Sequence, residues 1–310
     1  MQNSEKEIVL AIDKIFVPGT YYYSQYIVDQ LRKKENIQLI AEIIDISGKT
    51  ITEAVLVFLA SVRYLKDSIN ALKFLEAANQ FEHFVQENKS QILELSIQGK
   101  VQGNLPERAL PVIDIINRQF PGEKISVIEL GASFGLIGQF LLDPQNILKK
   151  NRFYFLNNQQ YPTRYEPIYK YLGIDISVPE KKWLISCFSN TDDAFRIEKF
   201  INNLNPSPNF DLIEKSAIGF SSISKVKYIS NENTKRVVLT SFMLYQLEET
   251  LQKQLTNEIV NFCEQTDAHW IKQEVDLSNA EFGPDYYISL DNKRIISLQD
   301  DKCTSWKWID

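Results

Sequence analysis

Apolar residues recur at helical spacing along the first third of the chain, from residue 8 to about residue 116. The longest stretch of this pattern runs from Thr52 to Phe84, and Thr52 and Ser90 are of the residue types that open helices. Glycine and proline mark the loop that ends the region, at Gly99, Gly103 and Pro106. The pattern therefore predicts a helical region over residues 1–115.

The pattern changes after Pro121. Residues Ile125–Leu130 form a short apolar run rich in β-branched residues, which is typical of a buried strand, and glycines follow it. Further along, strand-like and helix-like segments alternate, which predicts parallel strands joined by helices. The expected strands cover residues 168–174, 210–214, 236–241 and 269–274, and the expected helices cover residues 192–204 and 248–265.

Two short strand-like runs close the chain, Tyr286–Leu290 and Arg294–Leu298, and turn residues separate them. They predict an antiparallel hairpin at the end of an otherwise parallel sheet. The expected fold is thus α/β and Rossmann-like, with an N-terminal helical cap over residues 1–115 and a sheet domain over residues 116–310. A ligand site is expected at the carboxyl ends of the strands, beneath the cap, where the strand order reverses.

The composition is that of a globular protein, since 44% of the 310 residues are hydrophobic and 24% are charged. Acidic residues outnumber basic ones, 40 to 34, and the basic residues form no stripe, which argues against a nucleic-acid partner. The polar start and the short apolar runs predict a cytoplasmic chain with no membrane partner. With three separated cysteines and two histidines, we expect neither a disulfide framework nor a metal site.

The strongest chemical signal is the segment Glu129-Leu130-Gly131-Ala132-Ser133-Phe134-Gly135, which follows a strand and opens a helix. Small residues there let a ligand approach backbone N–H groups. The segment resembles motif I of the class I S-adenosylmethionine (SAM) methyltransferases, with Ser133 where a glycine is usual. The resemblance implies SAM as cofactor. It implies that Gly131, Ala132, Ser133 and Gly135 line the methionine part and that Glu129 lies near its ammonium group.

Later segments resemble the same superfamily in the same order. The resemblance implies that Asp175, at the end of the second strand, holds the cofactor ribose, and that Glu214 or Ser216 lies beside the adenine. The segment from Arg236 to Tyr245 is similar to the fourth strand and its acceptor-side loop. Two candidate catalytic residues follow from position alone, Tyr245 and Glu274, at the ends of the fourth and fifth strands.

Much of the chain also resembles a bacterial family of unknown function with an E-hydrophobic-G-A-S-x-G motif preceded by N-x-P-x-R. Here the second element is Asn104-Leu105-Pro106-Glu107-Arg108. Arg108 is a candidate anion anchor for the substrate, because guanidinium groups bind carboxylates in bidentate fashion. The other candidate substrate contacts are Ser241 and the aromatic residues Tyr22 and Tyr23, whose rings attract cations.

These features favour a SAM-dependent transferase, most simply a methyltransferase acting on a small molecule or a peptide. An enzyme that transfers the aminocarboxypropyl group of SAM is an alternative, and so is a non-catalytic ligand-binding module. A serine hydrolase is a third alternative, because Gly131–Gly135 also fits G-x-S-x-G with Ser133 as nucleophile. His269 lies downstream in the order such a triad requires, with Asp175 or Asp211 between.

Overall fold

A computed structural model describes residues 5–15, 24–68, 70–101, 105–145, 165–188, 191–205, 207–230, 233–276, 285–299, 303 and 306–309. The structure divides into two compact units. The helical unit comprises residues 1–103 and 179–202, and the sheet unit comprises residues 104–178 and 203–310. The chain therefore passes between the units three times. The division expected from the sequence has a single boundary at residue 115, with residues 179–202 in the sheet domain.

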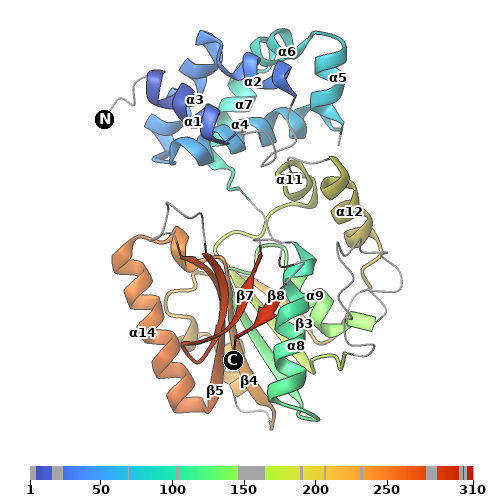
Figure 1. The fold of residues 1–310 in the computed structure, drawn as a ribbon, viewed down its shortest axis with the longest axis vertical. Coiled ribbons are helices and arrows are strands. Elements are labelled where there is room, and N and C mark those ends of the chain that lie inside the picture. The colour runs from blue at the N-terminus through green and yellow to red at the C-terminus, as the bar shows by residue number, and fades with distance from the viewer. Residues whose placement is uncertain are drawn as a thin grey trace. The chain divides into compact units, whose positions relative to one another are not determined.

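The helical unit contains helices from both of its chain segments, drawn in blue to cyan and in olive in Figure 1. Helix α4 is its centre, because every residue from Val57 to Arg63 is buried, as expected for a helix surrounded by others. The helices are α1 (Glu5–Ile15), α2 (Gln25–Leu31), α3 (Lys34–Ser47), α4 (Ile51–Lys66), α5 (Ala71–Ala77), α6 (Phe81–Glu87), α7 (Lys89–Gln98), α11 (Lys181–Ser186) and α12 (Thr191–Asn202).

The start of α4 is set by a capping box. Thr50 Oγ1 accepts a hydrogen bond from the amide of Glu53, and Glu53 Oε2 accepts one from the amide of Thr50. The expectation that Thr52 opens this helix was therefore wrong by two residues. Thr52 lies inside the first turn and is exposed. Ser90 likewise lies inside α7, which begins at Lys89.

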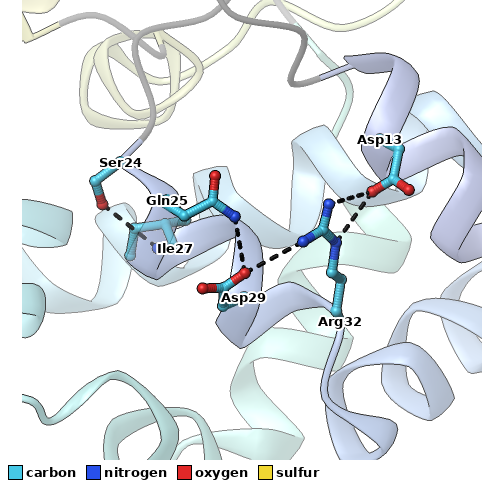
Figure 2. A network of polar contacts seen from close by, with 6 residues as sticks. All are labelled: Asp13, Ser24, Gln25, Ile27, Asp29 and Arg32. Atoms are coloured by element: carbon cyan, nitrogen blue, oxygen red, sulfur yellow. Dashed lines mark hydrogen bonds and ion pairs between the residues drawn. The ribbon is translucent and has the colours of Figure 1, made fainter.

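An exposed polar network joins α1 to α2 (Figure 2). The Arg32 guanidinium donates to Asp13 Oδ1 through Nη2 at 2.6 Å and to Asp29 Oδ1 through Nη1 at 3.2 Å. Gln25 Nε2 also donates to Asp29 Oδ1, at 2.8 Å, and Ser24 caps α2. All of these charged side chains are well exposed, so solvent screens them and each ion pair contributes little to stability.

The sheet unit is built on one eight-stranded sheet with the strand order β3-β2-β1-β4-β5-β6-β7-β8. The first five strands are parallel and the last three are antiparallel to their neighbours. This confirms the predicted α/β fold with its terminal antiparallel section. The strands are β1 (Ile125–Leu130), β2 (Lys170–Asp175), β3 (Phe210–Glu214), β4 (Lys235–Ser241), β5 (Ala268–Asp276), β6 (Asp285–Leu290), β7 (Lys293–Leu298) and β8 (Trp306–Trp308).

Each face of the sheet is covered by its own helices (Figure 1). Apolar side chains at the even-numbered positions of β1, β2, β4 and β5, such as Ile128 and Trp270, form one core with α13 and α14. Side chains at the odd-numbered positions of these four strands face α8, α9 and a short 3-10 helix, η1; the ring of Tyr171, for instance, lies against Gly138 of α9. The helical elements of this unit are η1 (Pro106–Arg108), α8 (Ala109–Gln119), α9 (Leu136–Leu142), η2 (Phe220–Ser222), α13 (Ser224–Ser230), η3 (Leu244–Gln246) and α14 (Glu249–Thr266).

Two features were not expected from the sequence. The connection from β2 to β3 carries α11 and α12, which belong to the helical unit. Strand β8 extends the sheet beyond the predicted hairpin, and Trp308 Nε1 donates to Asp114 of α8 at 3.2 Å. Among the described residues, no helix combines the length and apolar character needed to cross a bilayer.

Candidate functional site

The candidate site lies in the sheet unit, at the carboxyl ends of β1, β2, β4 and β5. Strands β2 and β4 flank β1 on opposite sides, so the connections from β1 and from β4 leave in opposite directions along the sheet. This reversal of strand order opens a crevice at the carboxyl edge of such sheets, where ligands bind. The position of the glycine segment, directly after β1, agrees with that expectation.

The glycine turn between β1 and α9 is tight. Gly131, Ser133 and Gly135 all have positive φ angles, of 75°, 52° and 74°, which glycine tolerates and serine adopts at a cost. Four amides of the turn have protein acceptors: Gly131 and Ala132 donate to Ile174 O, Ser133 donates to Asp175, and Gly135 donates to Ala132 O. The turn therefore offers a ligand fewer free amides than the sequence motif suggested.

Neighbouring side chains also fill the spaces that the glycines leave. A Cβ on Gly131 would lie 2.6 Å from Met243 Sδ, and a Cβ on Gly135 would lie 2.6 Å from the Phe210 ring. The flexible Met243 side chain can shift, so Gly131 is needed mainly for its backbone angle, whereas the Phe210 ring is rigid and makes Gly135 necessary for packing as well. The glycines alone therefore do not identify a ligand.

Asp175 is the last residue of β2, and its carboxylate lies beside the turn. Its Oδ2 accepts the Ser133 amide at 2.7 Å, and its Oδ1 accepts the Ser177 amide at 3.1 Å. A carboxylate has about four lone-pair positions, so two remain for hydroxyl donors. The residue is half-buried, so its carboxylate still reaches the surface.

Glu129 is fully buried at the end of β1, on the odd-numbered face. Tyr171 OH donates to its Oε2 at 2.5 Å, while its Oε1 has no hydrogen-bond partner among the described residues. Burial raises the pKa of Glu129 to about 8, although the Tyr171 hydroxyl and the nearby Arg108 charge oppose this. The carboxyl group is therefore largely protonated at neutral pH.

Arg108 reaches the same edge from η1, which precedes α8. It is buried, its guanidinium carbon lies 4.5 Å from the centre of the Phe242 ring, and its charge acts on Glu129. Its carbonyl oxygen accepts a hydrogen bond from Gln273 Nε2 of β5 at 2.9 Å. The structure thus brings Arg108 to the ends of β1, β4 and β5, although it lies far from Phe242 and Gln273 in sequence.

The two candidate catalytic residues differ in their surroundings. Glu274 is buried and its Oε1 accepts the Leu244 amide at 2.9 Å; burial raises its pKa, and hydrogen bonds from the amides of Met243, Leu244 and Tyr245 partly offset the rise. Through these hydrogen bonds Glu274 fixes the start of η3 to the end of β5. Tyr245 lies in η3 and is 48% exposed.

The remaining predicted contacts are more scattered. Ser241 ends β4, is buried, and its Oγ has no partner among the described residues. Glu214 ends β3 beside Asp175 and is exposed, and the nearby Ser216 accepts the Ile218 amide in a local turn. Tyr22 and Tyr23 lie outside the described residues, as does Asn104 of the N-x-P-x-R element.

The serine hydrolase alternative lacks its histidine at this edge. His269 is the second residue of β5 and pairs in register with Val237, which pairs with Val127 of β1. That level is roughly 10 Å below the end of β1, and Ser133 lies beyond this end. His269 Nδ1 instead lies 2.7 Å from Asp291 Oδ2. The chain's other histidine, His83, belongs to the helical unit.

Sequence reasoning missed three residues that shape this edge. Tyr171 supports Glu129, Phe242 lies under Arg108, and Gln273 binds the Arg108 carbonyl. One signal was available for Gln273, because it is a polar residue between two apolar residues of the same strand face, Ile271 and Val275. In the sequence, Tyr171 was an ordinary strand residue and Phe242 the first residue of the loop after the fourth expected strand, and only the contacts reveal their positions.

Comparison of the chain with protein-family models and with curated protein sequences finds no match to either. The likeness to methyltransferases therefore consists of the motifs described above and a Rossmann-like sheet.

Proposed function

We propose that the sheet unit binds SAM at the carboxyl ends of β1 and β2 and acts as a SAM-dependent transferase, most simply a methyltransferase. One observation supports this most directly: the Asp175 carboxylate accepts the amide of Ser133 at 2.7 Å. Asp175 ends β2 and Ser133 lies in the glycine turn after β1, 42 residues away in sequence. Their contact brings the carboxylate and the turn to the same side of the candidate site. This is the arrangement in which a carboxylate can accept ribose hydroxyls beside a turn that approaches the ligand closely.

The residues present fit the amino-acid end of SAM in a particular way. Because the turn amides already have protein acceptors, the ligand carboxylate needs a side-chain donor, and Arg108 is a guanidinium at the same edge. The unpartnered Oε1 of Glu129 suits the ligand ammonium group. An ammonium group beside Glu129 favours the charged carboxylate, so binding should release a proton.

When bound, SAM supplies an electrophilic methyl group. The contribution of this chain is then mainly to align an acceptor with that group and to exclude water. A product analysis separates methyl transfer from aminocarboxypropyl transfer, since the first leaves S-adenosylhomocysteine and the second leaves methylthioadenosine.

The test is calorimetric titration with SAM and with S-adenosylhomocysteine, on the wild type and on Asp175→Asn. Loss of hydrogen bonds to a charged group costs about 1.5–3 kcal/mol, so the variant should bind both ligands about tenfold to a hundredfold more weakly. Asp211→Asn is the matched control, because Asp211 lies on the adjacent β3 and pairs with Lys225.

If neither SAM nor S-adenosylhomocysteine gives a heat of binding at millimolar concentration, the proposal is overturned. Equal weakening by Asp175→Asn and Asp211→Asn would instead remove the ribose role from Asp175.

A further inference from the structure

A buried polar pair lies beside the candidate cofactor turn. Ser241 of β4 and Gln273 of β5 are direct neighbours in the parallel register, so their side chains are on the same face of the sheet. Thr240 of β4 pairs with Leu130 of β1, so the next residue, Ser241, lies level with Gly131. This is the place between β1 and β4 where the strand order reverses. Both residues are buried, with exposed fractions of 3% and 0%.

The orientation of the Gln273 amide is determined by its surroundings. Its Nε2 donates to Arg108 O at 2.9 Å, and this carbonyl can only accept, so the nitrogen must face it; Cys303 Sγ lies 3.7 Å from the same nitrogen. Its Oε1 therefore points elsewhere, and it has no partner among the described residues. Ser241 Oγ is in the same situation. Buried polar atoms without partners are uncommon and costly.

We propose that Ser241 Oγ and Gln273 Oε1 form an acceptor subsite that receives the N–H groups of an amine, so that the group transferred goes to nitrogen. This inference rests on the proposed function, because it assigns the second substrate of the same site. The amide oxygen is an obligate hydrogen-bond acceptor and the hydroxyl accepts as well as it donates. Together they match an amino group, which has two N–H donors and a lone pair left for attack.

The neighbouring carboxyl groups argue against the other acceptor classes. An alcohol needs a base to take its proton, but in the proposed function Asp175 holds the ribose and Glu129 holds the ligand ammonium group, while Glu274 accepts the Leu244 amide of η3. A carboxylate or thiolate needs no base, but the fixed Gln273 oxygen would repel its charge. A neutral amine needs no base for attack and is attracted by both oxygens.

The transfer balances without a base in the site. The amine lone pair forms the new N–C bond while the S–C bond breaks, and the bonding electrons remain on sulfur. An alkylamine is an ammonium ion in water, so it gives up one proton to solvent as it enters the subsite as the neutral amine, and the product then leaves as an alkylammonium ion.

Met243 follows Ser241 by two residues, packs against the core on the even-numbered face, and places its Sδ against Gly131 of the cofactor turn. Methionine has three rotatable bonds and adapts its position readily, so Met243 is suited to move aside for a ligand.

The experiment uses the full-length protein with SAM carrying a labelled methyl group, and two matched pools of small acceptors. One pool contains primary alkylamines, and the other contains the corresponding primary alcohols. SAM binding is measured first by calorimetry, so that failure of the cofactor proposal is seen separately. We expect label in the amine pool only.

The variants assign the subsite. Ser241→Ala removes an unpartnered buried hydroxyl, so the fold should tolerate it, while KM for the amine should rise about tenfold for one lost hydrogen bond. Its SAM affinity should stay within about twofold. Ser289→Ala is the matched control, because Ser289 on β6 is also buried with an unpartnered hydroxyl. Label in the alcohol pool or in neither pool, with SAM bound, would overturn the inference, as would an unchanged KM in Ser241→Ala.

Discussion

Glu129 is the residue whose environment has the clearest physical consequence. Its pKa is about 8 in the folded protein, against about 4.3 for an unperturbed glutamate. Between these values the folded protein keeps a proton that the unfolded chain releases. The free energy of unfolding should therefore fall as the pH rises from about 4.5 to about 8, by about 1.4 kcal/mol per pH unit from this group.

Glu129→Gln should remove this dependence, because glutamine resembles the protonated acid and its oxygen can still accept from Tyr171. Urea unfolding at pH 5.5 and 7.5 should show the wild type losing about 2.7 kcal/mol more than the variant. Glu123→Gln, at an exposed site just before β1, is the control and should follow the wild type. Parallel pH curves for Glu129→Gln and the wild type would refute a protonated Glu129.

Ser133 separates the two chemical interpretations of the glycine turn. Its φ of 52° is strained for serine and free of strain for glycine, and its buried Oγ has no partner among the described residues. Ser133→Gly should therefore keep or slightly raise the melting temperature and preserve SAM binding. A fluorophosphonate probe should leave Ser133 unlabelled in the wild type, since His269 is at a distant level of the sheet. Labelling that depends on His269 would restore the hydrolase interpretation.

At the scale of elements, the capping box of α4 decides where the central helix of the helical unit begins. Thr50→Ala removes the side-chain acceptor of the Glu53 amide and should lower the free energy of unfolding by about 1 kcal/mol. Thr50→Asn should restore most of this loss, since asparagine is also a good N-cap. Thr52→Ala is the control and should be neutral, because Thr52 is exposed within the helix. Chemical denaturation followed by circular dichroism measures all three; a larger loss for Thr52→Ala would contradict the observed helix start.

At the scale of the whole molecule, Trp183 ties the second chain segment of the helical unit to the first. Its Nε1 donates to Lys100 O at 2.9 Å, its ring lies 5.9 Å from that of Tyr64, and it is 8% exposed. Trp183→Ala should cost about 3–5 kcal/mol in the helical unit. The chain's other tryptophans, Trp270, Trp306 and Trp308, all belong to the sheet unit and report on it separately by fluorescence.

In Trp183→Ala, the helical circular dichroism signal should therefore be lost at lower denaturant concentration than the tryptophan fluorescence transition. Phe195→Ala removes an exposed aromatic side chain from α12 and should shift neither. A common shift of both signals in Trp183→Ala would show that the two units unfold as one cooperative block.

The order and type of most elements followed from local patterns. Strands β1 and β3 were predicted at their observed bounds, and β4, β5 and the hairpin were predicted within a few residues of theirs. These predictions succeeded because a buried strand needs a continuous apolar run and a turn needs particular residues. Strand β8 was missed because Trp306–Trp308 is too short to show a period. Asp175 was expected at the end of the second strand, but its contact with Ser133 of the glycine turn came from the structure.

The sequence by itself thus determined the α/β class, the parallel core and the edge where polar residues gather. Only the tertiary structure decided that Arg108 and Gln273 meet there, that Met243 and Phe210 fill the space beside the glycines, and that residues 179–202 join the helical unit. The physical reason is the distance along the chain over which the two kinds of information act. Periodicity reports which face of an element is buried, whereas side-chain partners depend on contacts between residues far apart in the chain, which no local pattern encodes.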